Sequence, residues 1–575
     1  MTSIFETKLE RTLDTLVERA APGQSIEAWT FDDAKSRRAA EQALKDKGVT
    51  ARIHSAYKPL LFAFLEEIDR QGVTAIEVRY PVHADAPANR FRLEAYPLAA
   101  LVGDADIAFI AREDDELVYD VTLTRNGQTG TLKVQAPNRV HTDAVGETNL
   151  SPTGWISRDG ATGERLETDY ERLFGLAIEA IANHDWGNEE PYFEELNIAV
   201  SHPAEDMPLA VGDEVVSLRE ALHEDFYFSL LEFFQKKSGR PLGDRGLKPG
   251  QIVPEIVRSN GEISVRVETR PLSTGFRDGP EQEIDTASEP PAVAQMSRLL
   301  SDIGGEEFDA RSRSGRVLSA HYVRGSDTAV MISGGQHPNE TTGIVGAIRA
   351  ARALKQRAGA HFTISPIENP DGYALHQRLR VDNPRHMHHA ARYTALGDDL
   401  EYRTAENSGQ HLNEKAIRFT AQELSGAQLH INLHGYPSHE WTRPLSGYVP
   451  RGFGMWTLPK GFFLIMRHHA GWTQQAEAIL DHVTRHLGAI PGILDYNNRQ
   501  IALYETHAGE TGFRIINGFP CLSSVDDRHT VPLTLITEYP DETIYGDDFV
   551  TGHTAQMETV ISAYDVWQTL NAYTS

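Results

Sequence analysis

Four short apolar segments in the second half of the 575-residue chain constrain its fold most strongly, because they alternate with helical patterns. The segments begin at Ala329, Phe362, Gln428 and Leu533. The helical patterns follow Thr341 and cover the regions Leu412–Leu424, Met466–Leu487 and Thr551–Tyr573. Such alternation is typical of α/β folds in which helices cover both faces of the sheet. We therefore predict for residues 291–575 a mainly parallel or mixed sheet sandwiched by helices.

His337 and Glu340 are the most informative polar residues, because they lie three positions apart between a predicted strand and a predicted helix. At a helix start this spacing directs both side chains to one side, so an imidazole nitrogen and a carboxylate oxygen can bind one cation. His434 follows the apolar segment Gln428–Leu433. It would lie at the sheet edge, where open α/β folds keep their sites, and would complete a three-ligand set that leaves one position for water. For the first pair alone, a capped helix start with a surface carboxylate is the alternative.

Four elements follow one another in an order that extends this interpretation. His337-x-x-Glu340 comes first, Asn-Pro-Asp-Gly at residues 369–372 second, the His-Gly pair at His434 third, and Glu538 after an apolar strand last. This order resembles the zinc carboxypeptidases, the M14 metallopeptidases, over residues 295–575. The resemblance implies one zinc ion (Zn2+) per chain, bound by His337, Glu340 and His434. It also implies hydrolysis of an amide bond in a small peptide or peptide-like metabolite.

Two further catalytic residues are expected from the same resemblance. Glu538 would be the general base that takes a proton from the attacking water and passes it to the leaving amine; a buried glutamate paired with an arginine is the alternative. Arg392 would polarise the substrate carbonyl and stabilise the oxyanion, because an arginine stays charged and offers a rigid set of donors. Arg380 and Arg385 are alternative candidates, and a surface or ion-paired arginine is the structural alternative for all three.

The chain departs from the family pattern at residues 401–403. The family has Asn-Arg there to bind the terminal carboxylate of the substrate, whereas this chain has Glu401 and Tyr402, followed by Arg403. In this register an anionic substrate end would be repelled, and a shift of one residue would restore the clamp through Arg403. The departure motivates a second hypothesis, a zinc deacylase or amidohydrolase that acts on an acylated amino acid or a modified metabolite.

Three other features have competing interpretations. The histidines at 386, 388 and 389 are either a second metal site or solvated and pocket-shaping side chains. Residues 439–441 (His-Glu-Trp) either contact substrate or form a polar turn with one packed indole. Cys521, the single cysteine, is either a nucleophile or a small packed thiol.

Residues 1–290 contain no catalytic motif and are predicted to form an α+β region of one or two subdomains. We expect helices over residues 1–50 and 170–237, with Leu9, Leu13, Leu16 and Val17 on one stripe of the first. The expected strands are Ile76–Tyr80, Phe91–Tyr96, Leu117–Leu123 and Glu262–Val267, with a hairpin turn at Asn126-Gly127. An acidic, proline-containing linker is expected over 278–291. A third hypothesis follows, a non-catalytic binding protein on a peptidase scaffold in which residues 1–290 bind the partner.

Composition limits the partners. The formal net charge of -27 argues against nucleic acid and anionic membranes. No apolar run is long enough to span a bilayer, no secretory signal is visible, and one cysteine cannot form an internal disulfide. A cytoplasmic protein with a small substrate, either a peptide or an acyl-amino acid, is therefore expected. The sequence leaves the side-chain preference and the oligomeric state open, a homo-oligomer included.

Overall fold

The computed structural model describes residues 2–403 and 413–572, and its C-terminal half contains a nine-stranded sheet. In spatial order the strands are β17 (Glu306–Arg311), β18 (Val317–Val323), β20 (Phe362–Ser365), β19 (Val330–Gly334), β21 (Leu429–Tyr436), β25 (Leu533–Pro540), β22 (Phe463–His468), β24 (Phe519–Val525) and β23 (Arg514–Ile516). β20, β19, β21 and β25 pair in parallel, and antiparallel pairing begins at β18 on one side and at β22 on the other. The four predicted apolar segments are thus the central strands of a mixed sheet.

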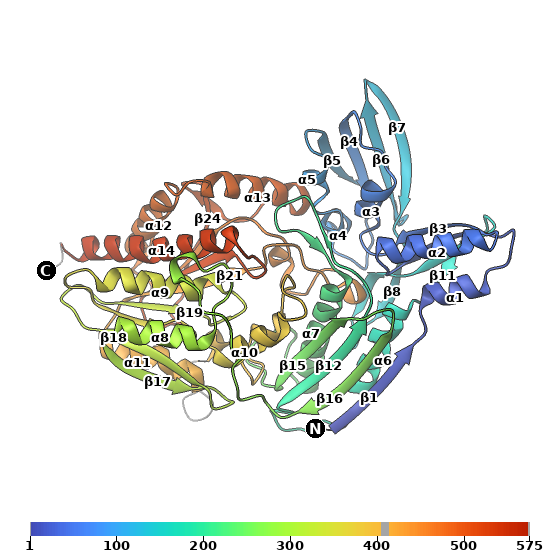
Figure 1. Cartoon of the computed structure of the whole chain (residues 1–575). Coiled ribbons are helices and arrows are strands. Elements are labelled where there is room, and N and C mark those ends of the chain that lie inside the picture. The colour runs from blue at the N-terminus through green and yellow to red at the C-terminus, as the bar shows by residue number, and fades with distance from the viewer. Residues whose placement is uncertain (1, 404–412, 573–575) are drawn as a thin grey trace.

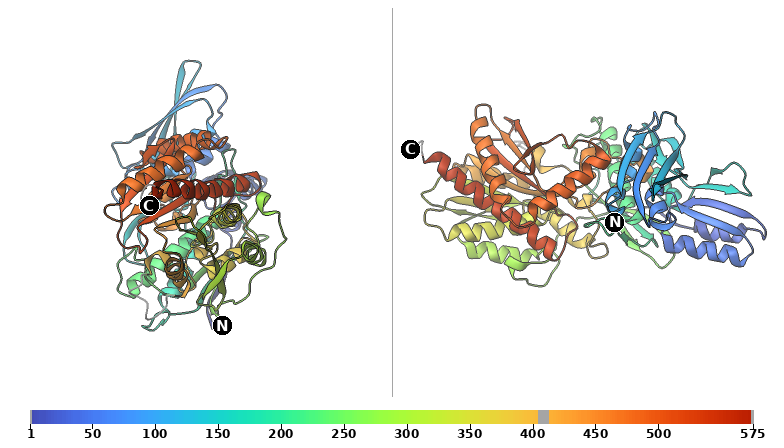
Figure 2. Two further views of the ribbon diagram at one scale, coloured as in Figure 1. Left: turned by 90° about the vertical axis from the view of Figure 1, so that its left-hand side faces the viewer. Right: turned by 90° about the horizontal axis from the view of Figure 1, so that it is seen from above.

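Helices cover both faces of this sheet. Every residue of β21 and β25 is buried, as expected of central strands that are covered on both sides. The helices that share the largest hydrophobic core with one face are α8 (Val293–Ile303), α9 (Thr342–Lys355), α12 (Thr473–Leu487) and α14 (Asp547–Asn571). On the other face, α11 (Ala416–Ser425) packs through Ile417 and Ala421. Figures 1 and 2 show how the helices surround the sheet. The predicted α/β fold class is confirmed.

The predicted helix boundaries in this half need correction at one place. Residues 466–468 belong to β22 rather than to a helix, because the apolar run from Phe463 pairs with β25 before a turn leads into α12. The other patterns correspond to α9, α11 and α14. Leu412 and Tyr573, the outer ends of two predicted helices, lie outside the described residues.

Three four-stranded sheets account for most of the N-terminal half. The first contains β1 (Thr2–Leu9), β16 (Ile263–Arg270), β12 (Glu195–His202) and β15 (Gln251–Arg258), and packs with α6 (Asp169–Ala182) and α7 (Leu218–Lys237). The second contains β11 (Glu164–Arg165), β10 (Trp155–Arg158), β2 (Ser25–Thr30) and β3 (Thr50–Ser55), with α1 (Thr12–Arg19) and α2 (Ala34–Asp46). The third contains β5 (Asp106–Ala111), β4 (Val73–Tyr80), β6 (Val118–Arg125) and β7 (Gln128–Gln135), with α3 (Pro59–Glu66). Figure 1 shows the third sheet projecting away from the nine-stranded sheet.

Two predictions for the N-terminal half are wrong. Residues 2–9 form strand β1 instead of a helix, because Phe5, Thr7 and Leu9 alternate with exposed residues at the two-residue period of a strand paired to β16. The region 1–50 therefore mixes β1 and β2 with the helices α1 and α2. Residues 90–94 form helix α4 instead of a strand. There Arg90 and Glu94, both buried, bind each other one helical turn apart at 2.8 Å.

Other predictions for this half agree with the structure in part. β4, β6 and β16 match the predicted strands, and Asn126 and Gly127 turn the chain between β6 and β7 with positive φ angles. α6 and α7 lie in the predicted helical region 170–237, but β12 separates them. Within the predicted linker, Ile284 and Ala287 pack into the core of the C-terminal half.

The two halves share a hydrophobic core. One cluster of buried residues combines α7 and the β12–β16 sheet with Leu375 and Leu379 of α10 (Pro370–Leu379), and it extends to Tyr393 and Trp441. The N-terminal half is therefore packed directly behind the segment that leads into the candidate site. Among the described residues, no helix has the length and apolar character needed to cross a membrane.

Candidate metal centre

The three predicted ligands come from three neighbouring places at the carboxyl ends of parallel strands. His337 lies in the turn after β19, Glu340 lies just before α9, and His434 is near the end of β21. The turn depends on Gly335, which has a φ of 61° and whose absent Cβ would lie 3.1 Å from the backbone of Ile367. The chain can therefore reverse sharply after β19 and bring His337 back over the sheet.

The ligand atoms of these residues converge on one point. The Nδ1 atoms of His337 and His434 are 3.1 Å apart. The Glu340 carboxylate lies against both, with Oε1 3.0 Å from His337 Nδ1 and Oε2 2.9 Å from His434 Nδ1. All three side chains are buried, and within the described residues they form the one group of at least three such side chains placed to hold a metal ion. Two imidazole nitrogens and a carboxylate are a donor set that fits zinc.

The carboxyl of this group is ionised, and the pKa values of its two imidazoles shift in opposite directions. Burial raises the pKa of Glu340, but the positive charges of His337 and Arg392 outweigh burial and lower the pKa. Burial lowers the pKa of His434, whereas Glu340 and Asp399 outweigh burial and raise the pKa of His337. The backbone N–H of Gly435 donates to Glu340 Oε2 at 3.0 Å, which fixes the carboxylate beside the two rings.

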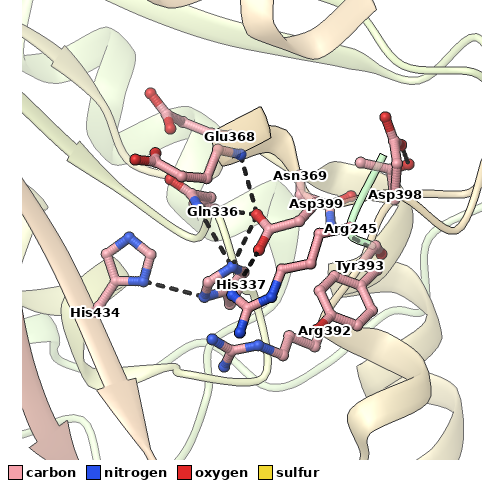
Figure 3. Close-up of polar contacts among 12 residues, drawn as sticks. Arg245, Gln336, His337, Glu368, Asn369, Arg392, Tyr393, Asp398, Asp399 and His434 are labelled. Atoms are coloured by element: carbon pink, nitrogen blue, oxygen red, sulfur yellow. Dashed lines mark hydrogen bonds and ion pairs between the residues drawn. The ribbon is translucent and has the colours of Figure 1, made fainter. Parts of the chain in front are cut away.

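Asp399 orients His337 from the side opposite the ligand atom. Asp399 Oδ1 lies 3.3 Å from His337 Nε2 and also accepts the backbone N–H of Glu401 at 3.0 Å. A carboxylate on the second ring nitrogen fixes the tautomer of a ligating histidine and makes it a better donor to a metal. Figure 3 shows His337 between Asp399 and His434. Asp399 is a functional candidate that the sequence did not predict, although it lies two residues before Glu401, in the segment that departs from the family pattern.

Glu538 lies one strand away from the ligands. It pairs in register with His434 across β21 and β25, and its side chain lines the same cleft as His337 and His434. Within the described residues its carboxylate makes no hydrogen bond, so the alternative of a glutamate hydrogen-bonded to an arginine is not observed. Burial, followed by the negative charge of Glu340, raises the pKa of Glu538.

Arg392 also lines the cleft, but it is already bound to a ligand side chain. Its guanidinium donates to Glu340 Oε1 and lies 3.9 Å from Glu542 Oε1. The buried Nε of Arg392 has no partner among the described residues. The two alternative candidates lie elsewhere: Arg380 binds Glu289 and Pro290, and Arg385 lies 3.6 Å from Asp213.

Residues 401–403 divide between the cleft and the interior. Glu401 and Tyr402 line the cleft, whereas Arg403 is buried in ion pairs with Asp398 and Glu414 and does not line it. The charge of Glu401 is balanced by Arg467, at 2.8 Å, and by other cations. A clamp made by Arg403 is therefore absent from the cleft, and Glu401 does not present an uncompensated negative charge to a ligand.

The N-terminal half contributes directly to the cleft. Arg245, in the loop between α7 and β15, is the cleft-lining residue that comes from before residue 290. His389 also lines the cleft, and its Nδ1 lies 2.5 Å from Glu224 Oε2 of α7. Neither contribution carries a short-range sequence signal, because each depends on contacts between segments that are distant in the chain.

The remaining candidate features have structural partners. His386 binds Asp206, His388 Nε2 lies 3.0 Å from the carbonyl oxygen of Asn383, and His389 faces Glu224, so the three rings do not converge. His439 is buried against Glu220 and Thr543, while Trp441 lines the cleft. Cys521 is buried, and burial raises the pKa of its thiol to about 12, as fits a packed thiol.

No family model and no curated protein matches this chain. The solved structures that resemble it include a metallo-carboxypeptidase from Burkholderia cenocepacia, which is 16% identical and has a TM-score of 0.29; the match covers 54% of this chain and 76% of that one. Thrombin activatable fibrinolysis inhibitor is 9% identical, with a TM-score of 0.30 and coverage of 48% and 73%. An aspartoacylase family protein from Mesorhizobium loti is 15% identical, with a TM-score of 0.23 and coverage of 44% and 66%. At this level the likeness does not assign the chain to a family, and its function is inferred from the site.

Proposed function

We propose that this protein is a zinc-dependent hydrolase that cleaves an amide bond in a small peptide or peptide-like metabolite, in the manner of a metallocarboxypeptidase. The observation that carries the proposal is the convergence of His337, Glu340 and His434 beside Glu538, in one cleft. All four side chains are buried, and His337, His434 and Glu538 line the cleft that a substrate can enter. A purely structural role would not require three such groups at one opening.

A zinc ion held by the three ligands would supply a Lewis acid that makes water a better nucleophile at neutral pH. Glu538 would take the proton of the attacking water on its carboxylate and transfer it to the leaving nitrogen. Its lack of a hydrogen-bond partner among the described residues supports this role, because the carboxylate is available to the substrate. Arg392 would donate an N–H to the carbonyl oxygen as negative charge develops there.

Asp399 would act through His337 rather than on the substrate. Its carboxylate holds the proton of His337 on Nε2 and so leaves Nδ1 free to bind the metal. The Gly435 N–H holds the Glu340 carboxylate in the same way. Two candidate ligands are thus held in place by further polar contacts: His337 by Asp399, and Glu340 by the N–H of Gly435.

A second candidate is a deacylase or amidohydrolase of the same mechanism whose substrate lacks a free α-carboxylate. The position of Arg403 favours it, because this arginine is buried in ion pairs and does not reach the cleft. A substrate series in free-acid and carboxamide forms separates the two: a strong preference for the free acid would reject the deacylase. The third hypothesis, a binding protein without catalysis, predicts no hydrolysis of any acyl-amine even with zinc bound.

Elemental analysis of the purified protein tests the proposal directly. About one zinc per chain is expected in the parent, and little in the variant His434→Ala, which removes one of three ligands. His482→Ala is the matched control, since His482 is exposed on α12 and its loss should leave zinc content unchanged. No metal in the parent, together with no uptake of added zinc, would refute the hydrolase.

A further inference from the structure

Three arginines line the cleft, and they differ in how their charge is used. Arg392 is bound to Glu340, and Arg467 donates to Glu401 at 2.8 Å and to Asp526 at 3.4 Å. Arg245 differs: within the residues that the structure describes, its guanidinium makes no side-chain hydrogen bond and has a looser ion pair with Asp399, at 3.6 Å. Of these three arginines, Arg245 is therefore the one whose whole guanidinium remains available to bind an anion.

The surroundings of Arg245 keep its charge at the cleft surface. Its side chain is 30% exposed, and the oxygen that it faces, Asp399 Oδ2, is 3.6 Å away, while Oδ1 of the same carboxylate faces His337. The guanidinium carbon lies 4.8 Å from the ring centre of Phe453 and 5.8 Å from that of Tyr402. Aromatic faces attract a cation without consuming its N–H donors, so these rings hold Arg245 in place and leave it able to bind an anion.

The backbone also fixes the loop that carries Arg245. Its carbonyl oxygen accepts the N–H of Asp399 at 3.2 Å, and the N–H of Gly250 donates to the carbonyl oxygen of Leu396 at 3.0 Å. Gly397 permits this approach: a Cβ there would lie 2.6 Å from the carbonyl oxygen of Gly250. Arg245 is thus attached to the same segment that carries Asp399, and Figure 3 shows its side chain with Asp399 and Arg392 around His337.

We propose that Arg245 determines specificity by binding a carboxylate of the substrate, so that the N-terminal half supplies the anion-binding residue that residues 401–403 do not. This inference deepens and rests on the proposed hydrolase function. One available guanidinium matches the single charge and two oxygens of a carboxylate. A dianion such as phosphate is disfavoured, because Asp399, Glu401 and Glu538 line the same cleft. Aromatic side chains in the lining, Trp441 and Trp456 among them, favour an apolar group beside the carboxylate.

A binding measurement tests the inference without requiring catalysis. The probes are 3-phenylpropanoate and its neutral amide, 3-phenylpropanamide, titrated calorimetrically into protein freed of metal with a chelator. The parent should bind the acid roughly 10- to 100-fold more tightly than the amide, as a charge-assisted pair in a cleft allows. Arg245→Ala should remove this difference, and Arg245→Lys should keep part of it.

A kinetic measurement tests the same residue on the loaded enzyme. The substrates are N-acetyl-glycyl-phenylalanine and its carboxamide. Arg245→Ala should raise KM for the free acid at least about 10-fold, change kcat less, and leave the carboxamide unaffected. Lys248→Ala is the matched control, because Lys248 lies in the same loop but does not line the cleft. Thermal unfolding of each variant verifies folding.

The outcomes separate this inference from the proposed function. Hydrolysis by the parent without preference for the free acid, or an unchanged preference in Arg245→Ala, would overturn the role of Arg245 and leave the hydrolase standing. Acid-selective binding that depends on Arg245, with no hydrolysis of either substrate by zinc-loaded protein, would overturn the hydrolase and uphold the carboxylate site. An equal loss in Lys248→Ala would attribute the effect to loop disruption and overturn the specific role.

Discussion

The two halves of the molecule contribute to the cleft in different ways. The C-terminal half supplies His337, Glu340, His434 and Glu538 from strand ends and an adjoining turn of one sheet. Among the described residues, the N-terminal half has no comparable group of metal-binding side chains; it supplies Arg245 to the cleft and Glu224 of α7 as a partner of the cleft-lining His389. The candidate metal ligands and Glu538 therefore come from one sheet, whereas the lining and the charge of the cleft depend on both halves.

Helix α7 forms much of the charged contact between the two halves. Its acids Glu220, Glu224 and Glu232 are buried, although glutamate is rarely fully buried without a partner. Each binds a residue of the C-terminal half: Glu220 binds His439, Glu224 binds His389, and Glu232 binds Arg443. The charged side of α7 is therefore an internal contact between the halves rather than a solvated surface.

Glu538→Gln should separate chemistry from metal binding and should have the largest effect. Loss of the proton acceptor is expected to reduce turnover about 1,000-fold while zinc content stays near that of the parent, because Glu538 is not among the three ligands. Steady-state kinetics and elemental analysis measure the two quantities. Glu510→Gln, at an exposed position, should behave like the parent. Near-normal turnover with full metal occupancy would exclude Glu538 as the base.

Arg443→Ala should weaken the contact between the halves. Arg443 is fully buried, donates to Glu232 at 2.7 Å and to Ser229 at 3.1 Å, and its loss would leave buried polar groups without their partner. A decrease of about 4 kcal/mol in the free energy of unfolding is expected, measured by urea denaturation. Arg298→Ala, which removes an exposed pair with Glu281, should change it by less than about 1 kcal/mol. Similar losses of unfolding free energy in both variants would mean that the buried contact between the halves stabilises the protein no more than the exposed ion pair does.

His439 should make the same contact sensitive to pH. Burial lowers the pKa of His439, but Glu220 outweighs burial and raises it to about 9. A raised pKa in the folded state means that the stabilisation is complete below the ordinary pKa near 6.5 and is lost as pH rises through about 9. Its size is on the order of 3 kcal/mol.

Unfolding curves between pH 6 and pH 10 measure this contribution. The stability difference between the parent and His439→Gln should be largest at pH 6 and should shrink towards pH 10. A difference that does not change with pH would show that the pKa of His439 is not raised in the folded protein.

Asp399→Asn should have the smallest effect, and it should act on the metal site through His337. The amide cannot hold the His337 ring as the carboxylate does, so zinc affinity should fall about 10- to 100-fold. Competition with a chelator of known affinity measures the change. Asp382→Asn, at an exposed position, provides the control. Unchanged affinity in Asp399→Asn would mean that other contacts hold the ring.

The sequence predicted the C-terminal sheet more accurately than the N-terminal elements. β19, β21 and β25 are continuous apolar runs because both faces are covered, so their pattern is strong. The predictions for the segments that form β1 and α4 were wrong. A short segment of mixed polar and apolar residues fits both the two-residue repeat of a strand and the 3.6-residue repeat of a helix. The identity of these two segments depends on partners: β16 pairs with β1, and Arg90 binds Glu94 inside α4.

By itself, the sequence determined the fold class of the second half and the candidate ligands, because spacing of three residues and strand ends are local properties. The tertiary structure alone decided that Arg403 is buried in ion pairs, that Arg467 balances Glu401, and that Arg245 reaches the cleft. The physical reason is that burial and charge pairing depend on which distant segments pack together. The candidate ligands can therefore be recognised from local sequence, whereas the position of Arg245, which we propose sets selectivity, depends on the contact between the two halves.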